Sequence, residues 1–187
     1  MQILRKVTYQ FLFVVLLVCS TIILSAQKPP VQGYQIKAVF LLNFSRFVEW
    51  PASAFPSDKA PIIIGILGED PFGSYLDEVL AGEEVNGRSV IVKRFEDVDD
   101  IEVCHILYIK MKESEGMEKI IEPLKEKNTL TISDSDDFIK NGGMIRFVKV
   151  SKRIQFQINP EAAKAADIKI SSKLLSLAEI VAFNEKE

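Results

Sequence analysis

The sequence predicts an α/β fold, a three-layer sandwich in which a mostly parallel sheet of about six strands ends in an antiparallel hairpin and carries helices on both faces. Three observations favour this class. Four short apolar runs, at residues 62–67, 89–93, 105–109 and 129–133, are typical of strands that are buried on both faces. Helical patterns alternate with these runs, which implies parallel strands joined by crossovers. Near the end of the chain, two further strand patterns are separated by only two residues, a spacing typical of a hairpin.

The composition fits one globular domain behind an export segment. The chain has 187 residues, of which 48% are hydrophobic, with 23 Lys plus Arg against 26 Asp plus Glu. An apolar fraction this high excludes a disordered chain. The formal net charge of -3 gives no electrostatic reason to expect nucleic acid as a partner, because phosphate binding depends on clustered Lys and Arg.

The N-terminus is predicted to be a cleaved signal peptide, residues 1–26, which directs the chain to the periplasm. Two basic residues precede an apolar run at residues 11–24, and a polar stretch follows it. The run is shorter than the roughly 20 residues that a membrane-spanning helix needs, so a permanent anchor is the weaker interpretation. A lipoprotein processed at Cys19 is also disfavoured, because apolar sequence continues beyond it. Residues 27–187 would then form a single α/β domain.

The first helix of this domain is predicted at residues 31–50, and Pro51 is expected to end it. Its large apolar residues recur at steps of four, four and three and form one stripe: Ile36, Phe40, Phe44 and Phe47. This stripe is expected to be buried in the core or bound to a partner.

The connections between the four apolar runs differ in length. Residues 72–80 are predicted to form a helix with Asp70 as its N-cap and Pro71 at its first position. Residues 96–103 are too few for more than one turn of helix. Residues 114–126 are predicted to form a polar helix with an apolar inner face.

The predicted hairpin joins residues 144–150 to residues 153–159. Apolar residues alternate with Gln155 and Gln157 in the second strand, so one of its faces is expected to be buried and the other wet. A final helix at residues 172–183 is expected to close the sheet.

Reactive side chains do not assemble into a catalytic group in this sequence. His105 is the only histidine, and it adjoins Cys104 in a predicted strand, where neighbouring side chains point to opposite faces. Both residues are therefore interpreted as structural. Gly65 and Gly68 are three positions apart, which does not match the dinucleotide-binding glycine pattern. We predict no catalytic residue, no metal site and no cofactor.

Two loops at predicted strand ends are candidates for binding. Asp70 and Phe72 follow the first run, and Asp134, Phe138 and Met144 follow the fourth. Because the carboxyl ends of parallel strands share one edge, where such folds bind ligands, we expect these residues to lie at a common edge. Calcium binding is disfavoured, because no EF-hand spacing is present.

Four blocks of the sequence resemble the YfiR/HmsC-like family. Residues 36–51, IKAVFLLNFSRFVEWP, are similar to its opening signature, and residues 65–73 resemble its I-L-G-x-D-P-F-G turn. Residues 130–144 resemble its T-x-S-D to G-G-M segment. The I-N pair at residues 158–159 and the S-S-K-L-L run at residues 171–175 resemble its ending. These matches span nearly all of the chain that follows the predicted signal peptide.

The resemblance implies a periplasmic regulator that binds the extracytoplasmic domain of an inner-membrane diguanylate cyclase of the YfiN type. Binding would repress the cyclase, and with it cyclic-di-GMP signalling and biofilm formation. The resemblance also makes a homodimer a reasonable expectation. It includes redox control through disulfides, but Cys104 would be the only cysteine after cleavage, so no intramolecular disulfide is expected here.

The contact residues are predicted to be Arg46, Phe47, Glu49 and Trp50, because Trp and Arg anchor interfaces disproportionately. An equally weighted alternative has Trp50 covering the core and Arg46 pairing with a nearby acid. The second hypothesis for function is a periplasmic module that binds a small molecule at the two strand-end loops and feeds a sensor kinase or another receptor. An enzyme is the least favoured class.

Overall fold

A computed structural model describes residues 31–111 and 116–181, with the side chains of residues 31–32 left out of the description. The predicted signal peptide and the end of the predicted final helix lie outside the described residues. No helix in the described part of the chain is long and apolar enough to cross a membrane.

The α/β class is confirmed. The main sheet has eight strands, not about six, in the order β10-β8-β7-β6-β5-β2-β4-β3. Its strands are β2 (Ile62–Gly68), β3 (Glu84–Val85), β4 (Arg88–Phe95), β5 (Ile106–Lys110), β6 (Leu130–Ser133), β7 (Ile145–Val150), β8 (Arg153–Ile158) and β10 (Glu179–Ile180). Pairing is parallel except in the β7–β8 hairpin and between β3 and β4.

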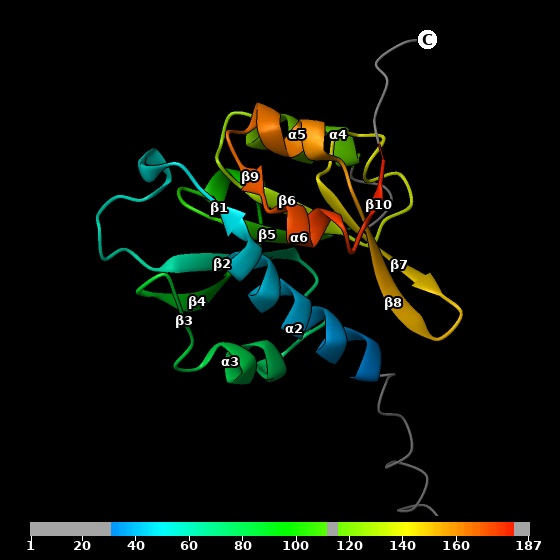
Figure 1. The fold of residues 1–187 in the computed structure, drawn as a ribbon, viewed down its shortest axis with the longest axis horizontal. Coiled ribbons are helices and arrows are strands. Elements are labelled where there is room, and N and C mark those ends of the chain that lie inside the picture. The colour runs from blue at the N-terminus through cyan, green and yellow to red at the C-terminus, as the bar shows by residue number, and fades with distance from the viewer. Residues whose placement is uncertain (1–30, 112–115, 182–187) are drawn as a thin grey trace, which may run out of the picture. The chain divides into compact units, whose positions relative to one another are not determined.

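Helices cover both faces of this sheet, as predicted (Figure 1). They are α2 (Val31–Phe47), α3 (Ser74–Leu80), α4 (Met117–Ile121), α5 (Pro160–Ala165) and α6 (Ser172–Leu175), with short 3-10 turns at Ala52–Ala54, Val98–Asp100 and Glu122–Leu124. The buried residues of α2, α3, α5 and α6 pack on one face of the strands, and those of α4 pack on the other. Alternate residues of each central strand therefore enter two separate cores.

The first helix ends earlier than predicted and buries a different arc. It stops at Phe47, because the chain turns into β1 (Val48–Glu49), which pairs with β9 (Lys169–Ile170). Its fully buried residues include Ala38, Leu41 and Phe44, whereas Ile36 is 42% exposed. Of the two expectations for the stripe, burial in the core or binding to a partner, burial does not hold for Ile36. The helix is apolar around most of its circumference, so periodicity alone did not determine which side docks on the sheet.

Two local predictions around α3 and β4 need correction. Helix α3 begins at Ser74 after Gly73, so Pro71 is not helical. Asp70 accepts hydrogen bonds from the backbone N–H groups of Phe72 and Gly73, at 2.8 and 3.1 Å, and stabilises the turn before the helix. Strand β4 is not buried on both faces, because most of its residues are half-buried or exposed near the edge of the sheet.

The end of the chain is a short helix followed by a strand, not the single helix predicted. Helix α6 ends at Leu175, and Leu177, which was expected to pack inward, is 68% exposed. Glu179 and Ile180 pair with β8 instead. The backbone bonds gained along the free edge of β8 satisfy groups that a continued helix would have left unpaired.

Two further features were not predicted. A tight turn at Asn86-Gly87, with φ of 52° and 75°, joins β3 to β4. Asn-Gly is the strongest short-range hairpin signal, so the sequence did contain the information. Helix α5 begins with Asn159 as its N-cap and Pro160 at its first position, which is also a recognisable start signal.

Candidate functional site

A polar cluster joins the first helix to the carboxyl ends of the central strands. The Lys37 ammonium on α2 donates to the Asp134 carboxylate, which follows β6, at 2.7 Å. Lys110 at the end of β5 donates to the Tyr34 hydroxyl of α2 at 2.7 Å. The Tyr108 hydroxyl is buried beside them and has no hydrogen-bond partner among the described residues. We call Tyr34, Lys37, Tyr108, Lys110 and Asp134 the Asp134 cluster.

The ionisation of this cluster follows from its burial and its pairing. Burial acts to raise the pKa of Asp134, but the hydrogen bond and charge of Lys37 outweigh it and hold that pKa below its usual range. Burial raises the pKa of Tyr108, so its hydroxyl stays protonated. Burial acts to lower the pKa of Lys110, but the Tyr34 contact raises it overall. Asp134 is thus an ionised anchor for α2.

A second polar cluster lies at the end of β2. Arg94 of β4 donates to Asp70 at 2.7 Å and to Asp77 of α3 at 2.6 Å. Its third contact is the Gly73 carbonyl, at 3.0 Å. The hydrogen bond from Arg94 lowers the pKa of Asp77 below its ordinary value. Both carboxylate oxygens of Asp70 therefore stabilise this turn, one by accepting from the backbone and the other by accepting from Arg94.

The apolar residues predicted for the two loops are buried. Phe72 packs edge-on against Tyr108, with ring centroids 4.9 Å apart. Phe138 is fully buried, and Met144 is nearly so. Met144 donates its backbone N–H to the Thr131 hydroxyl of β6, at 3.2 Å. Met144 therefore lies toward the amino end of β6, and the expectation that it shares the carboxyl edge with Asp134 was wrong. Because β7 runs parallel to β6, the chain between them must turn back along the sheet.

The predicted contact residues surround the junction of α2 and β1. Arg46 pairs with Glu83 at 2.6 Å, and both side chains are exposed. The half-buried ring of Phe47 lies 5.1 Å below the Lys173 ammonium. Glu49 is exposed on β1, and Trp50 is half-buried with its indole N–H enclosed and without a hydrogen-bond partner in the described part of the chain.

The outer face of α2 presents two exposed aliphatic side chains, followed by two polar ones. Ile36 and Val39 are 42% and 43% exposed, and Asn43 and Arg46 continue the same line at helical spacing. We call these four residues the outer face of α2. Its signal in the sequence was the excess of apolar residues in residues 36–44, which is more than one buried side of a helix can accommodate.

His105 and Cys104 are structural, on opposite faces of the sheet. The His105 ring accepts a hydrogen bond from the Ile63 N–H at its Nδ1 atom, at 3.1 Å, and stacks on Phe55 with centroids 4.3 Å apart. The Arg88 guanidinium covers Phe55 at 3.8 Å. Burial lowers the pKa of His105 to about 4. Burial also raises the pKa of the Cys104 thiol to about 12, so it is not a reactive thiolate.

The stability of the protein is expected to fall as the pH drops from about 6.5 to about 4, partly through His105. The unfolded imidazole takes up a proton near pH 6.5, but the buried one takes it up only near pH 4. That difference corresponds to about 3 kcal/mol of unfolding free energy lost below pH 4. Urea unfolding at a series of pH values measures it.

The matched control for this measurement is His105→Gln, which cannot titrate but leaves every carboxylate in place. Subtracting its pH profile from that of the unmodified protein isolates the histidine. Identical slopes for the two proteins between pH 4 and 6.5 would show that His105 does not contribute.

The described residues contain no group of three or more His, Cys, Asp or Glu side chains that could hold a metal ion. The site instead consists of a helix, α2, that an ion pair connects to the sheet and that exposes two aliphatic side chains.

A family model described as YfiR/HmsC-like matches residues 34–179. The chain belongs to the YfiR/HmsC-like family. The match begins inside α2 and ends in β10, so it covers nearly all the described structure.

Membership in the YfiR/HmsC-like family confirms the resemblance predicted from the sequence blocks. It supports a regulatory protein of the periplasmic kind and not an enzyme, and it implies contact with a partner protein. A comparison with curated proteins finds no match to this chain.

Proposed function

We propose that residues 1–26 of this YfiR/HmsC-like protein direct its export to the periplasm and are then cleaved. The exported protein regulates an inner-membrane signalling protein by binding its extracytoplasmic domain. The partner we propose is a diguanylate cyclase of the YfiN type, whose output of cyclic-di-GMP, and with it biofilm formation, falls when the regulator is bound. A partner that is bound more tightly in its inactive state is shifted toward that state, and this needs no chemistry from the regulator. Membership in the YfiR/HmsC-like family supports this function.

The outer face of α2 is the observation that carries this proposal. Ile36 and Val39 expose aliphatic side chains one turn apart, the pattern by which a helix inserts into an apolar groove of a partner. Arg46 lies farther along the same line, near Trp50. Its exposed ion pair with Glu83 contributes little to stability, so Arg46 can exchange Glu83 for an acid of the partner at small cost.

The anchoring of α2 explains how such a face is held ready for binding. The Lys37–Asp134 ion pair connects one side of the helix to the sheet, and Phe44 buries the same side farther along. A rigid helix loses little conformational entropy on binding. The contact residues predicted from the sequence lie at the carboxyl end of this helix and extend the surface onto β1.

Replacing Ile36 and Val39 together by aspartate is expected to weaken partner binding at least roughly thirtyfold, because two desolvated anchors become charged. Folding stability should change little, since both side chains are exposed. The assay is retention of an inner-membrane protein with a periplasmic domain and a cytoplasmic cyclase domain from envelope extracts, together with cellular cyclic-di-GMP, which should rise.

The control is Val150→Asp, which places an aspartate on an exposed apolar residue at the tip of β7. It should leave retention and cyclic-di-GMP unchanged. If the double variant retains the membrane protein as well as this control does, the outer face of α2 is not the contact surface.

A second candidate function is a periplasmic module that binds a small molecule and feeds a sensor kinase or another receptor. One observation favours it, a cleft of about 680 Å³ between α4 and α5. Recovery of metabolites but no membrane protein with the purified chain would support this function over the first.

A further inference from the structure

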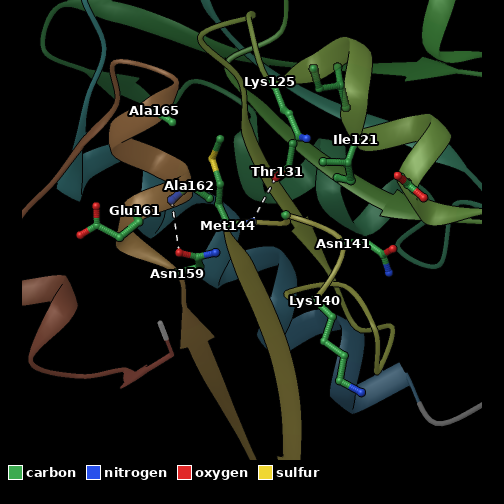
Figure 2. Close-up of a pocket in the computed structure, with 13 residues that line it drawn as sticks. Ile121, Lys125, Thr131, Lys140, Asn141, Met144, Asn159, Glu161, Ala162 and Ala165 are labelled. Carbon is green, nitrogen blue, oxygen red and sulfur yellow. Dashed lines mark hydrogen bonds between the residues drawn. The ribbon is translucent and has the colours of Figure 1, made fainter. Parts of the chain in front are cut away.

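The cleft between α4 and α5 has its floor where β7 begins and β8 ends (Figure 2), and no residue of the Asp134 cluster lines it. Met144 precedes β7 and Asn159 follows β8, and the two are joined by a backbone hydrogen bond of 2.8 Å from Asn159 to Met144. Thr131 of β6 completes the floor. The volume, about 680 Å³, is in the range of sites that hold small organic ligands.

The floor contains a buried polar side chain with unused donors. Asn159 is only 3% exposed and lines the cleft. Its side-chain oxygen accepts a hydrogen bond from the Ala162 N–H at 3.2 Å and caps α5. Its NH2 group has no hydrogen-bond partner in the described part of the chain. The NH2 group is not among the enclosed side-chain atoms that lack a partner, so it retains contact with solvent, and an oxygen acceptor of a ligand can take the place of water there.

The Thr131 hydroxyl, which also lines the cleft, likewise has an unused donor. Its oxygen accepts from the Met144 N–H, and its proton is directed to no acceptor within the described residues. Thr131 and Asn159 both line the cleft, so each offers a donor to an oxygen acceptor such as a carbonyl or carboxylate.

The walls and the mouth have different chemistry from the floor. Apolar side chains line the cleft from α4, from the 3-10 turn that follows it, from α5 and from the floor: Ile121, Leu124, Met144, Ala162 and Ala165. Charges of both signs surround the mouth, on Glu118, Lys125, Lys140 and Glu161. The arrangement fits a molecule with an apolar body, a carbonyl oxygen at its inner end and a solvated outer end.

We propose that this cleft binds a small apolar molecule carrying a carbonyl oxygen, as in a carboxylate or a primary amide, with that oxygen held by Asn159 and Thr131. The inference rests on the second candidate function and is independent of the outer face of α2. It is tested with the purified protein alone, so its failure would not affect the proposal of partner binding.

Ligand-observed NMR with three probes of equal shape tests the recognition of the carbonyl group. Phenylacetate and phenylacetamide should bind, since each has an acceptor oxygen. The matched probe 2-phenylethylamine has an ammonium group, which only donates, and it should not bind. Comparison of the first two probes distinguishes a preference for the carboxylate from one for the amide. Binding of the amine as tight as that of the other two, or no binding of any probe at millimolar concentration, would overturn the proposal.

Two variants locate the site. Asn159→Asp keeps an N-cap oxygen for Ala162 but replaces the donor by a carboxylate, so it should weaken phenylacetate binding about tenfold or more, with less effect on phenylacetamide. Ala165→Phe should fill the cleft and abolish binding of both. Lys164→Phe is its control, because Lys164 is exposed on the same helix and does not line the cleft. Thermal unfolding verifies that each variant is folded. Binding unchanged in both Asn159→Asp and Ala165→Phe would place the ligand elsewhere and overturn the assignment.

Discussion

Replacing Phe44 by alanine is expected to lower the free energy of unfolding by about 3–5 kcal/mol. Phe44 is fully buried where α2 crosses the sheet. Its ring lies 5.3 Å from that of Phe156 and 5.9 Å from that of Phe147, so it joins the helix to both strands of the hairpin. The alanine would leave a cavity that three rigid elements cannot close. Equilibrium urea unfolding followed by circular dichroism measures the loss.

The control for this prediction is Val39→Ala on the same helix. Val39 is 43% exposed, so its truncation should change stability by about 0.5 kcal/mol or less. The comparison separates the packing of α2 from its helix propensity. A loss below about 1 kcal/mol for Phe44→Ala would mean that α2 is not held by this aromatic contact, and the rigid presentation of its outer face would then lose its support.

Gly68→Ala is expected to destabilise the protein by roughly 3 kcal/mol, through strain and overpacking together. Gly68 ends β2 with a φ of 83°, a conformation that side chains other than glycine rarely adopt. A Cβ atom would also collide with the Lys110 carbonyl oxygen and lie 2.6 Å from the Met111 sulfur. That carbonyl cannot move freely, because it accepts the Glu69 N–H at 3.0 Å. Thermal unfolding of the two proteins measures the difference.

Gly87→Ala is the matched variant, since it tests strain without the collision. Gly87 has a φ of 75°, but no atom lies within 4 Å of the position that a Cβ would take. Its substitution should cost about 1 kcal/mol. Equal losses for the two variants would show that the close approach of β2 to Lys110 is not what requires glycine at position 68.

The conformation of Gly68 also accounts for the turn at residues 65–73, whose glycine spacing does not match that of nucleotide-binding loops. Gly68 lets the chain leave β2 beside its neighbouring strand, and Asp70 then caps the turn before α3. The Asp70 carboxylate accepts hydrogen bonds from Arg94 and from two backbone N–H groups. A motif that resembled a ligand loop is thus a strand-to-helix connection.

Prediction succeeded best where one local signal dominated. The apolar run at residues 62–67 was predicted correctly as a buried strand, because it is apolar at nearly every position. The hairpin after Met144 was predicted correctly from the alternation of apolar and polar residues in its second strand. Prediction failed at the end of the chain, where residues 172–183 have a helical pattern. There the free edge of β8 offered backbone hydrogen bonds to Glu179 and Ile180, and no window of sequence contains that information.

The candidate sites divide in the same way. Arg46 and Trp50 could be named from residue type alone, but the exposure of Ile36 depends on which arc of α2 docks. The cleft at Asn159 could not be predicted, because its lining comes from four separate segments of the chain.

The sequence by itself determined the class of fold, the alternation of strands and helices, and the family. These follow from periodicity and residue type, which act over a few neighbouring positions. Only the tertiary structure decided which side of α2 faces outward, that Asp134 anchors Lys37, and that Met144 and Asn159 meet at the floor of a cleft. The reason is physical: burial, ion pairing and strand pairing are set by contacts between residues far apart in the chain, and a local pattern restricts those contacts without selecting among them.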